Sequence, residues 1–135
     1  MDMETQVIRL DPNQFSNHDI KKAINYLKNG NVIGFPTETV YGLGGSLNKI
    51  QSIYKIYRVK NRPMDNPLIV HISNYDMLQK LILEFPDHIK ALCHEFWPGP
   101  LTILFKKTSY VPNEVTAKLP TVAIRMPSHP IANTL

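Results

Sequence analysis

The sequence predicts an α/β fold in which helices pack against a sheet. Segments with apolar residues at helical spacing alternate with short apolar, strand-like runs, and Gly or Pro stands between many of them. The 135 residues are 43% apolar and 19% charged, which is enough apolar surface for one core. Because so short a chain cannot form two independent domains, we expect one domain over residues 1–135.

The first helix is predicted between Ser16 and Gly30. Ser16 and Asp19 form a capping-box pattern, apolar residues then recur on one face, and the Asn-Gly pair that ends at Gly30 is a typical stop. Residues 31–35 are apolar enough for a strand, which must end at the next residue because proline lacks the N–H of a central ladder. We expect residues 37–45 to form a loop.

The rest of the chain repeats this alternation. The elements expected are a helix at 48–57, a strand at 68–72, a helix at 73–82, a helix at 87–96, strands at 101–105 and 121–125 separated by a polar connection, and a helix from 128. Ser73 with Asp76 forms a second capping-box pattern. Because the sequence stops soon after the last helix begins, we expect the chain to be the front part of a longer domain.

The positive charge is concentrated in one short segment. The net charge of +4 comes from 15 cations and 11 acids, and residues 55–62 hold four cations and no acid. These four cations are Lys55, Arg58, Lys60 and Arg62. Such a segment indicates a local anion site more than a diffuse nucleic-acid surface. The alternative is that the cations only complement the dipole at the end of the predicted helix.

A candidate ligand site lies where several predicted strands end. The loop at 36–45 holds hydroxyls and glycines directly after a strand, so Thr37 is a candidate pocket wall, although a plain connecting loop remains the alternative. His71 interrupts an apolar strand and Arg125 ends another. If Thr37, Thr39, His71 and Arg125 lie at the carboxyl ends of parallel neighbours, they meet in one cleft. A lone strand histidine is otherwise more often a core residue.

Several functional classes are disfavoured. The five histidines show no pair four residues apart, and Cys93 is the only cysteine, so we expect no metal held by the protein. No segment approaches the roughly 18 apolar residues of a membrane helix, so we expect no membrane contact. Residues 1–10 lack an apolar segment, which argues against secretion. We expect a cytoplasmic protein and leave a mitochondrial form open.

Four segments occur in the order and spacing of a known family. They are GFPTETVYGLGG at 34–45, KNRPMDNPLIVH at 60–71, FWPGPLT at 96–102 and VAIRMPSHP at 122–130. Over about residues 15–135 the chain resembles the YrdC-type threonylcarbamoyl-AMP synthases. The resemblance implies a YrdC-like twisted, mixed, open sheet flanked by helices. The family's later Ser-x-Asn motif is not reached by Leu135, so we expect the sheet to be incomplete at the C-terminus and the activity of this chain alone to be in doubt.

The resemblance also implies a reaction and its partners. L-threonine, bicarbonate and ATP, the last as its Mg²⁺ complex, would give L-threonylcarbamoyladenylate and pyrophosphate, with no tightly bound cofactor. This is the first step of N6-threonylcarbamoyladenosine formation at position 37 of tRNA. A downstream threonylcarbamoyl transferase complex is implied, with tRNA as a further partner. The alternatives are a non-catalytic, RNA-binding module of this family or an inactive fragment.

Residue roles follow from the same motifs. The resemblance implies that Thr39, His71 and Arg125 contact L-threonine. It implies that ATP is contacted by residues from two segments, namely Lys60, Arg62, Asn66 and Thr121.

Overall fold

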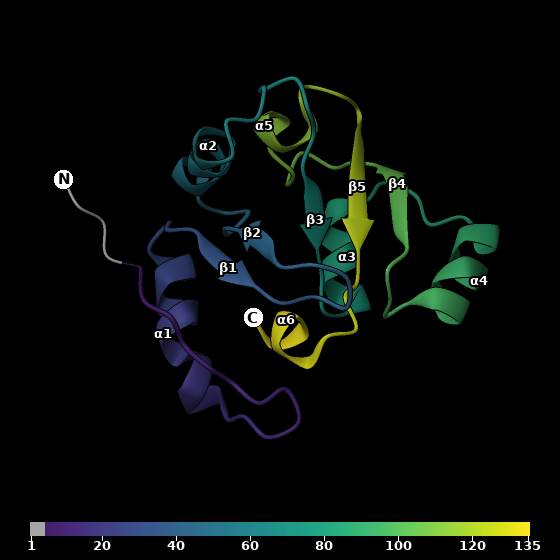
Figure 1. Cartoon of the computed structure of the whole chain (residues 1–135). Coiled ribbons are helices and arrows are strands. Elements are labelled where there is room, and N and C mark those ends of the chain that lie inside the picture. Colours follow the sequence, from purple (N-terminus) through teal and green to yellow (C-terminus); the bar gives the residue numbers. More distant parts are fainter. Residues whose placement is uncertain (1–4) are drawn as a thin grey trace.

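Six helices surround two small sheets in the computed structural model, which describes residues 5–135 (Figure 1). Residues 1–4, part of the expected domain and of the segment considered for a secretory signal, lie outside the described residues. The elements are α1 (Asn17–Lys28), β1 (Ile33–Phe35), β2 (Gly42–Gly44), α2 (Ile50–Val59), β3 (Ile69–His71), α3 (Tyr75–Leu81), α4 (Asp87–Phe96), β4 (Thr102–Lys106), α5 (Asn113–Thr116), β5 (Thr121–Arg125) and α6 (Pro130–Thr134). No helix of these residues is long and apolar enough to cross a membrane.

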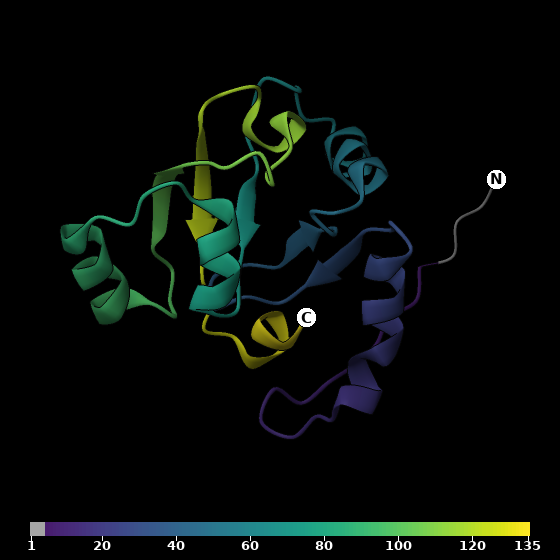
Figure 2. The same cartoon turned by 180° about the vertical axis from the view of Figure 1, so that it is seen from behind.

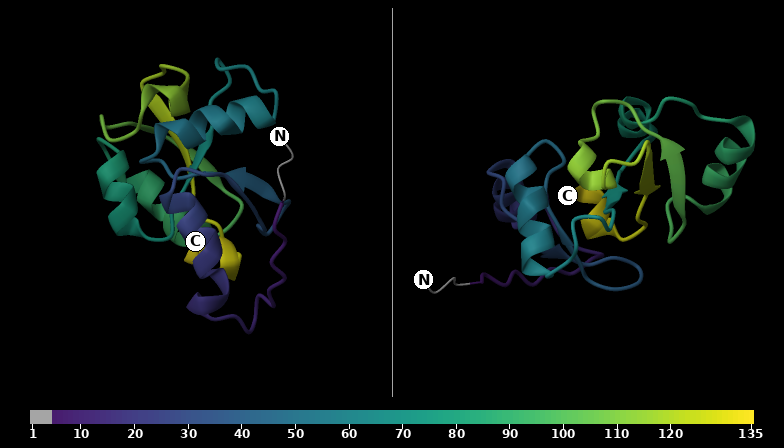
Figure 3. Two further views of the ribbon diagram at one scale, coloured as in Figure 1. Left: turned by 90° about the vertical axis from the view of Figure 1, so that its left-hand side faces the viewer. Right: turned by 90° about the horizontal axis from the view of Figure 1, so that it is seen from above.

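The larger sheet is mixed and open, as predicted. Its strand order is β3-β5-β4, with β3 parallel and β4 antiparallel to the central β5. The β1–β2 hairpin forms a separate two-stranded antiparallel sheet. Seen from above, the hairpin lies with α1 and α2 on one side of the molecule and the larger sheet with α4 on the other (Figure 3).

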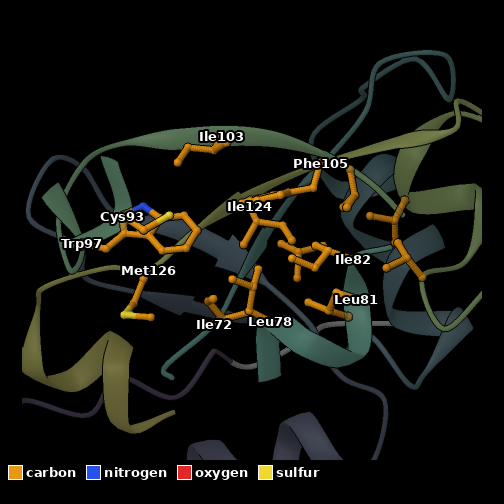
Figure 4. Packing of buried hydrophobic residues seen from close by; sticks show 14 of the residues in the cluster. Ile72, Leu78, Leu81, Ile82, Cys93, Trp97, Ile103, Phe105, Ile124 and Met126 are labelled. Carbon is orange, nitrogen blue, oxygen red and sulfur yellow. The ribbon is translucent and has the colours of Figure 1, made fainter. Parts of the chain in front are cut away.

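One face of the larger sheet carries the core. Side chains alternate along each strand, so Val70, Val122, Ile124, Ile103 and Phe105 point to the same face and are buried. Seen from behind, α3 covers this face (Figure 2). Figure 4 shows the apolar side chains gathered between the strands and α3. The opposite face carries the other set of strand residues, among them Ile69 and Leu104, which are 49% and 69% exposed.

The structure confirms the predicted start and end of the first helix, α1. Ser16 Oγ accepts a hydrogen bond from Asp19 N at 3.3 Å, and Asp19 Oδ2 accepts one from Ser16 N at 2.8 Å. The chain leaves the helix through Gly30 with φ of +80°, a conformation that glycine adopts at little cost.

The predicted loop at 37–45 is wrong in part, because it contains β2. Glycine is a poor strand former, so the sequence pattern hides this strand. The glycines are required by close packing: a Cβ on Gly44 would lie 2.6 Å from Phe35 Cε1, and one on Gly45 would lie 2.7 Å from the side chain of Ser52. The hairpin therefore packs its own backbone against an aromatic ring and against α2.

Two other local predictions need correction. Asn74, not Ser73, is the N-cap residue of α3, because its side chain accepts a hydrogen bond from Met77 N at 2.9 Å. The Ser73 hydroxyl instead lies 3.2 Å from Met77 Sδ. The polar connection before β5 also contains the short helix α5, which the sequence pattern does not indicate.

The Trp97–Pro100 corner between α4 and β4 is a packed structural element. Trp97 is 6% exposed, and its Nε1 donates a hydrogen bond to Leu101 O at 2.8 Å. Gly99 N donates to Met126 O at 2.8 Å, which joins the corner to the segment after β5. This contact fixes the end of β5, where Arg125 lies.

Candidate functional site

A polar row crosses the open face of the larger sheet at the ends of β3 and β5. His71 of β3 is the register partner of Arg125 of β5, and Arg125 is in turn the partner of Thr102 of β4. Arg125 Nε donates a hydrogen bond to Thr102 Oγ1 at 3.1 Å. Within residues 5–135 the terminal guanidinium nitrogens have no protein acceptor, so they are available to an anion. We call these three residues the polar row.

The surroundings of His71 favour its neutral form. Its ring is half-buried and meets the Phe35 ring edge-on, with the centroids 5.6 Å apart. Burial lowers the pKa of His71, the Arg125 charge lowers it further, and the Glu38 charge opposes both. A neutral imidazole offers one nitrogen that accepts a hydrogen bond and one that donates.

The loop after β1 reaches this row by a route the sequence did not predict. β1 pairs only with β2 within the described residues, so Thr37 and Thr39 do not follow a parallel neighbour of β3 and β5. The loop is instead tied to the segment after β5, because Glu38 Oε2 accepts a hydrogen bond from Ser128 N at 3.2 Å. The expected convergence of four parallel strand ends is thus wrong for this loop.

Thr37 shapes the loop more than it lines a pocket. Its Oγ1 accepts a hydrogen bond from Thr39 N at 3.2 Å and donates one to Val40 O. Thr39 is exposed, and its Oγ1 lies 3.1 Å from Thr37 Oγ1. Neither threonine lines either of the two cavities described below. Thr39 therefore lies on the surface of the loop, outside both cavities.

The basic segment ends in a turn held by Arg62. Arg62 Nε donates to Asn66 O at 3.2 Å and Nη2 donates to Pro67 O at 2.6 Å, while Tyr57 Oη donates to Asn66 O at 3.0 Å. The Asn66 residue is exposed. Two of the five guanidinium N–H donors thus stabilise the turn, which leaves three for a ligand.

A cavity of about 760 Å³ lies between the β1–β2 hairpin and β3. Lys60, Arg62 and His71 line it, together with Phe35. Only two of the four clustered cations therefore face it. Lys55 instead donates to Asn31 Oδ1 at 3.1 Å.

Thr121 lies away from the polar row. It begins β5, on the same open face as Arg125 but four residues earlier, which separates the two by about 13 Å at the usual rise per residue. Thr121 lines a second cavity of about 490 Å³, with Lys106, Lys107 and Lys118. The structure therefore brings His71 and Arg125 together and places Thr121 at the opposite end of the same strand.

Neither Glu38 nor Thr102 has a role predicted from the sequence. Glu38 Oε1 is buried and has no hydrogen-bond partner among residues 5–135. The signal for both residues was their presence in the quoted motifs at 34–45 and 96–102. In the part of the chain that the structure describes, no three His, Cys, Asp or Glu side chains gather as metal ligands.

Comparison with known proteins identifies the chain's relatives. The Sua5/YciO/YrdC family, described as telomere recombination, matches residues 25–135. The threonylcarbamoyl-AMP synthase of Pyrococcus abyssi is 44% identical over 113 residues, which cover 84% of this chain and 33% of the relative. The Bacillus subtilis threonylcarbamoyl-AMP synthase is 47% identical over 117 residues, which cover 86% of this chain and 34% of the relative. This chain thus spans about one third of the length of these curated relatives.

Solved structures of two relatives have the same fold. The crystal structure of P. abyssi Sua5 complexed with L-threonine matches with a TM-score of 0.86 and 42% identity, over 89% of this chain and 35% of that chain. The crystal structure of E. coli YciO matches with a TM-score of 0.79 and 26% identity, over 89% of this chain and 58% of that chain. The mixed, open sheet with flanking helices is therefore the fold of these proteins.

Proposed function

The chain belongs to the Sua5/YciO/YrdC family, and from this membership we propose that it carries substrate-binding residues of an L-threonylcarbamoyladenylate synthase. The reaction would convert L-threonine, bicarbonate and ATP into the adenylate and pyrophosphate. The names of the relatives from P. abyssi and B. subtilis support this assignment. The single observation that carries it is the polar row on the open sheet face, where an arginine with free donors stands beside a half-buried histidine.

The polar row has the chemistry of an amino-acid site. The terminal nitrogens of Arg125 can bind the carboxylate of L-threonine with two parallel hydrogen bonds. Neutral His71 can accept a hydrogen bond from the substrate, and the exposed Thr39 hydroxyl offers a further donor or acceptor from the hairpin. The co-crystallised L-threonine of the P. abyssi Sua5 structure supports the choice of this amino acid.

The basic turn has the chemistry of a triphosphate site. Lys60 and Arg62 line one cavity, and Arg62 is already oriented by its hydrogen bonds to the turn. We assign the phosphates of Mg²⁺-bound ATP to these two residues, with Asn66 beside them. From the family resemblance we assign Thr121 to the nucleotide as well; it lines a cavity with three lysines, separate from the cavity of Lys60 and Arg62.

The proposed reaction needs positioning and charge compensation. The threonine ammonium first loses a proton to solvent; the amine nitrogen then forms a bond to the bicarbonate carbon and water leaves, which gives a carbamate. A carbamate oxygen then attacks the α-phosphorus, and the bond to the β-phosphate breaks as pyrophosphate leaves. Both reactants are anions that repel each other in water, so the cations of the turn and the polar row favour their approach. No covalent nucleophile on the protein is needed.

The biological setting is part of the same proposal. We place residues 1–135 in a single YrdC-like catalytic domain that acts in the cytoplasm. Its product would supply the first step of threonylcarbamoylation at position 37 of tRNA. A threonylcarbamoyl transferase complex would consume the product, and tRNA is a further partner.

Calorimetry with paired variants tests the proposed function. L-threonine and Mg²⁺-bound ATP are each titrated into the wild-type chain, Lys60→Ala and Arg125→Ala. We expect both ligands to bind the wild type. Lys60→Ala should weaken ATP about tenfold or more and leave L-threonine unchanged, and Arg125→Ala should do the reverse, because each loses a charge-assisted hydrogen bond.

Two results would contradict the proposal. One is a wild-type chain that binds neither ligand. The other is a pair of variants that weaken both ligands equally, since the two sites would then not be separate. If tRNA binds while L-threonine and ATP do not, the chain is the RNA-binding module considered as the alternative.

A further inference from the structure

Glu38 has a buried carboxylate oxygen that nothing in the protein satisfies. Its Oε2 accepts a hydrogen bond from Ser128 N at 3.2 Å, which fixes the side chain across 90 residues of sequence. Its Oε1 is buried without a hydrogen-bond partner in the described residues. Buried polar atoms in native proteins normally have partners, and an unpaired charged oxygen is especially costly. Such an atom is a candidate acceptor for a ligand.

Glu38 and Arg125 both lie near the His71 ring. Arg125 is the register partner of His71, and Glu38 is bonded to Ser128, three residues after Arg125. The Arg125 charge lowers the pKa of His71 and the Glu38 charge raises it. They do not form an ion pair with each other: the ion pairs among residues 5–135 are Lys90–Asp87 and Lys106–Glu84. The site therefore presents one positive and one negative group, each with unused hydrogen-bonding capacity and not joined to the other.

This arrangement is complementary to an α-amino acid. A zwitterionic amino acid carries an ammonium and a carboxylate on one carbon, so it needs an acceptor and a donor group a short distance apart. We propose that Glu38 Oε1 accepts a hydrogen bond from the α-ammonium group of the L-threonine whose carboxylate binds Arg125. The inference rests on the proposed function and adds the residue that recognises the amino group.

A purely structural role for Glu38 makes a different prediction. If Glu38 only ties the hairpin loop to the segment before α6, its loss disturbs the site for every ligand alike. If it binds the ammonium, its loss affects only ligands that carry one. A comparison of two ligands on the same variants therefore separates the roles.

The test uses L-threonine and its deamino analogue, 3-hydroxybutanoate of matching configuration at C3. The analogue keeps the carboxylate, the side-chain hydroxyl and the methyl group, and it has a hydrogen in place of the ammonium, so it offers Glu38 no donor at that carbon. Both ligands are titrated by calorimetry into wild type, Glu38→Gln and Glu84→Gln. Glu38→Gln keeps the side-chain size and removes the charge, and Glu84→Gln is a matched control because this exposed carboxylate pairs with Lys106.

We expect Glu38→Gln to weaken L-threonine about tenfold or more and the analogue by less than about twofold, because only L-threonine loses a charge-assisted hydrogen bond. Glu84→Gln should change neither affinity. Equal weakening of both ligands by Glu38→Gln would overturn the inference and leave Glu38 as a loop anchor. Unchanged L-threonine affinity in Glu38→Gln would also overturn it. A wild-type chain that binds no L-threonine would instead overturn the proposed function itself.

Discussion

The two faces of the β3–β5–β4 sheet differ in character, although they are formed by the same three strands: one is buried and apolar, and the other is open and carries the polar row. On the covered face, Val70 and Ile124 are 9% and 0% exposed and pack under α3. On the open face, His71 and Arg125, each the next residue along its strand, form the polar row with Thr102. Because side chains alternate along a strand, the pairing that aligns the core also aligns the polar row. We therefore expect substitutions on the covered face to lower stability and substitutions of the alternate residues, on the open face, to weaken ligand binding.

The largest loss of stability is expected from a substitution on the covered face. Ile124→Ala should lower the free energy of unfolding by about 2–5 kcal/mol, because it removes buried methyl groups and leaves a cavity. The matched control is Ile69→Ala on the open face of the neighbouring strand, which should cost less than about 1 kcal/mol. Urea denaturation of both variants measures the difference. Equal losses would mean that the open face is also covered in solution.

A smaller loss of stability is expected at Arg62, a proposed ATP-binding residue that also supports the fold. Arg62→Ala should lower the free energy of unfolding by about 1–3 kcal/mol, because two backbone carbonyls of the turn lose their guanidinium donors. Lys60→Ala is the control, since this exposed lysine should change stability by less than about 0.5 kcal/mol. Equal stability of the two variants in urea would contradict the role of Arg62 in the turn.

Thr102 should act through Arg125 and leave stability nearly unchanged. Thr102→Val keeps the side-chain shape and removes the hydroxyl that accepts from Arg125 Nε. We expect L-threonine affinity to fall about three- to tenfold, in line with one lost hydrogen bond. Thr102→Ser should restore the affinity, because it restores the acceptor. Failure of the serine variant to rescue binding would show that Thr102 matters for packing and not for positioning Arg125.

The smallest expected effect is a pH dependence of the stability, caused by His71 of the polar row. The pKa of His71 in the fold lies below its ordinary value of 6.5, mainly because of burial and then because of Arg125. The unfolded chain then binds more protons than the folded one just below pH 6.5, so His71 lowers stability as the pH falls through this range. Urea titrations of wild type and His71→Asn from pH 7.5 to about 5 should show a steeper acid loss for wild type. Parallel curves would contradict the lowered pKa.

The sequence predicted what local signals determine. The capping box at Ser16 and Asp19, the stop at Gly30 and the apolar strands all depend on neighbours within a few residues, and the structure confirms them. The strand β2 was missed because its role depends on Phe35 packing against glycine backbone, which a strand propensity does not capture.

The site was predicted less completely because it is assembled by long-range contacts. The pairing of His71 with Arg125 followed from their places at strand ends. The contact of Glu38 with Ser128 joins residues 90 positions apart, and no pattern in the sequence indicates it. The donors that Arg62 gives to the turn are also invisible in a count of cations.

We propose above all that the open face of the β3–β5–β4 sheet binds L-threonine at the polar row. Titration of the isotope-labelled chain with L-threonine, followed by NMR, tests it most directly. We expect the largest shifts at the Arg125 Nε–H, the His71 ring and Thr102, with the neighbouring core residues Val70 and Ile124 nearly unchanged. Shifts confined to the cavity around Thr121, or spread equally over both faces of the sheet, would contradict it.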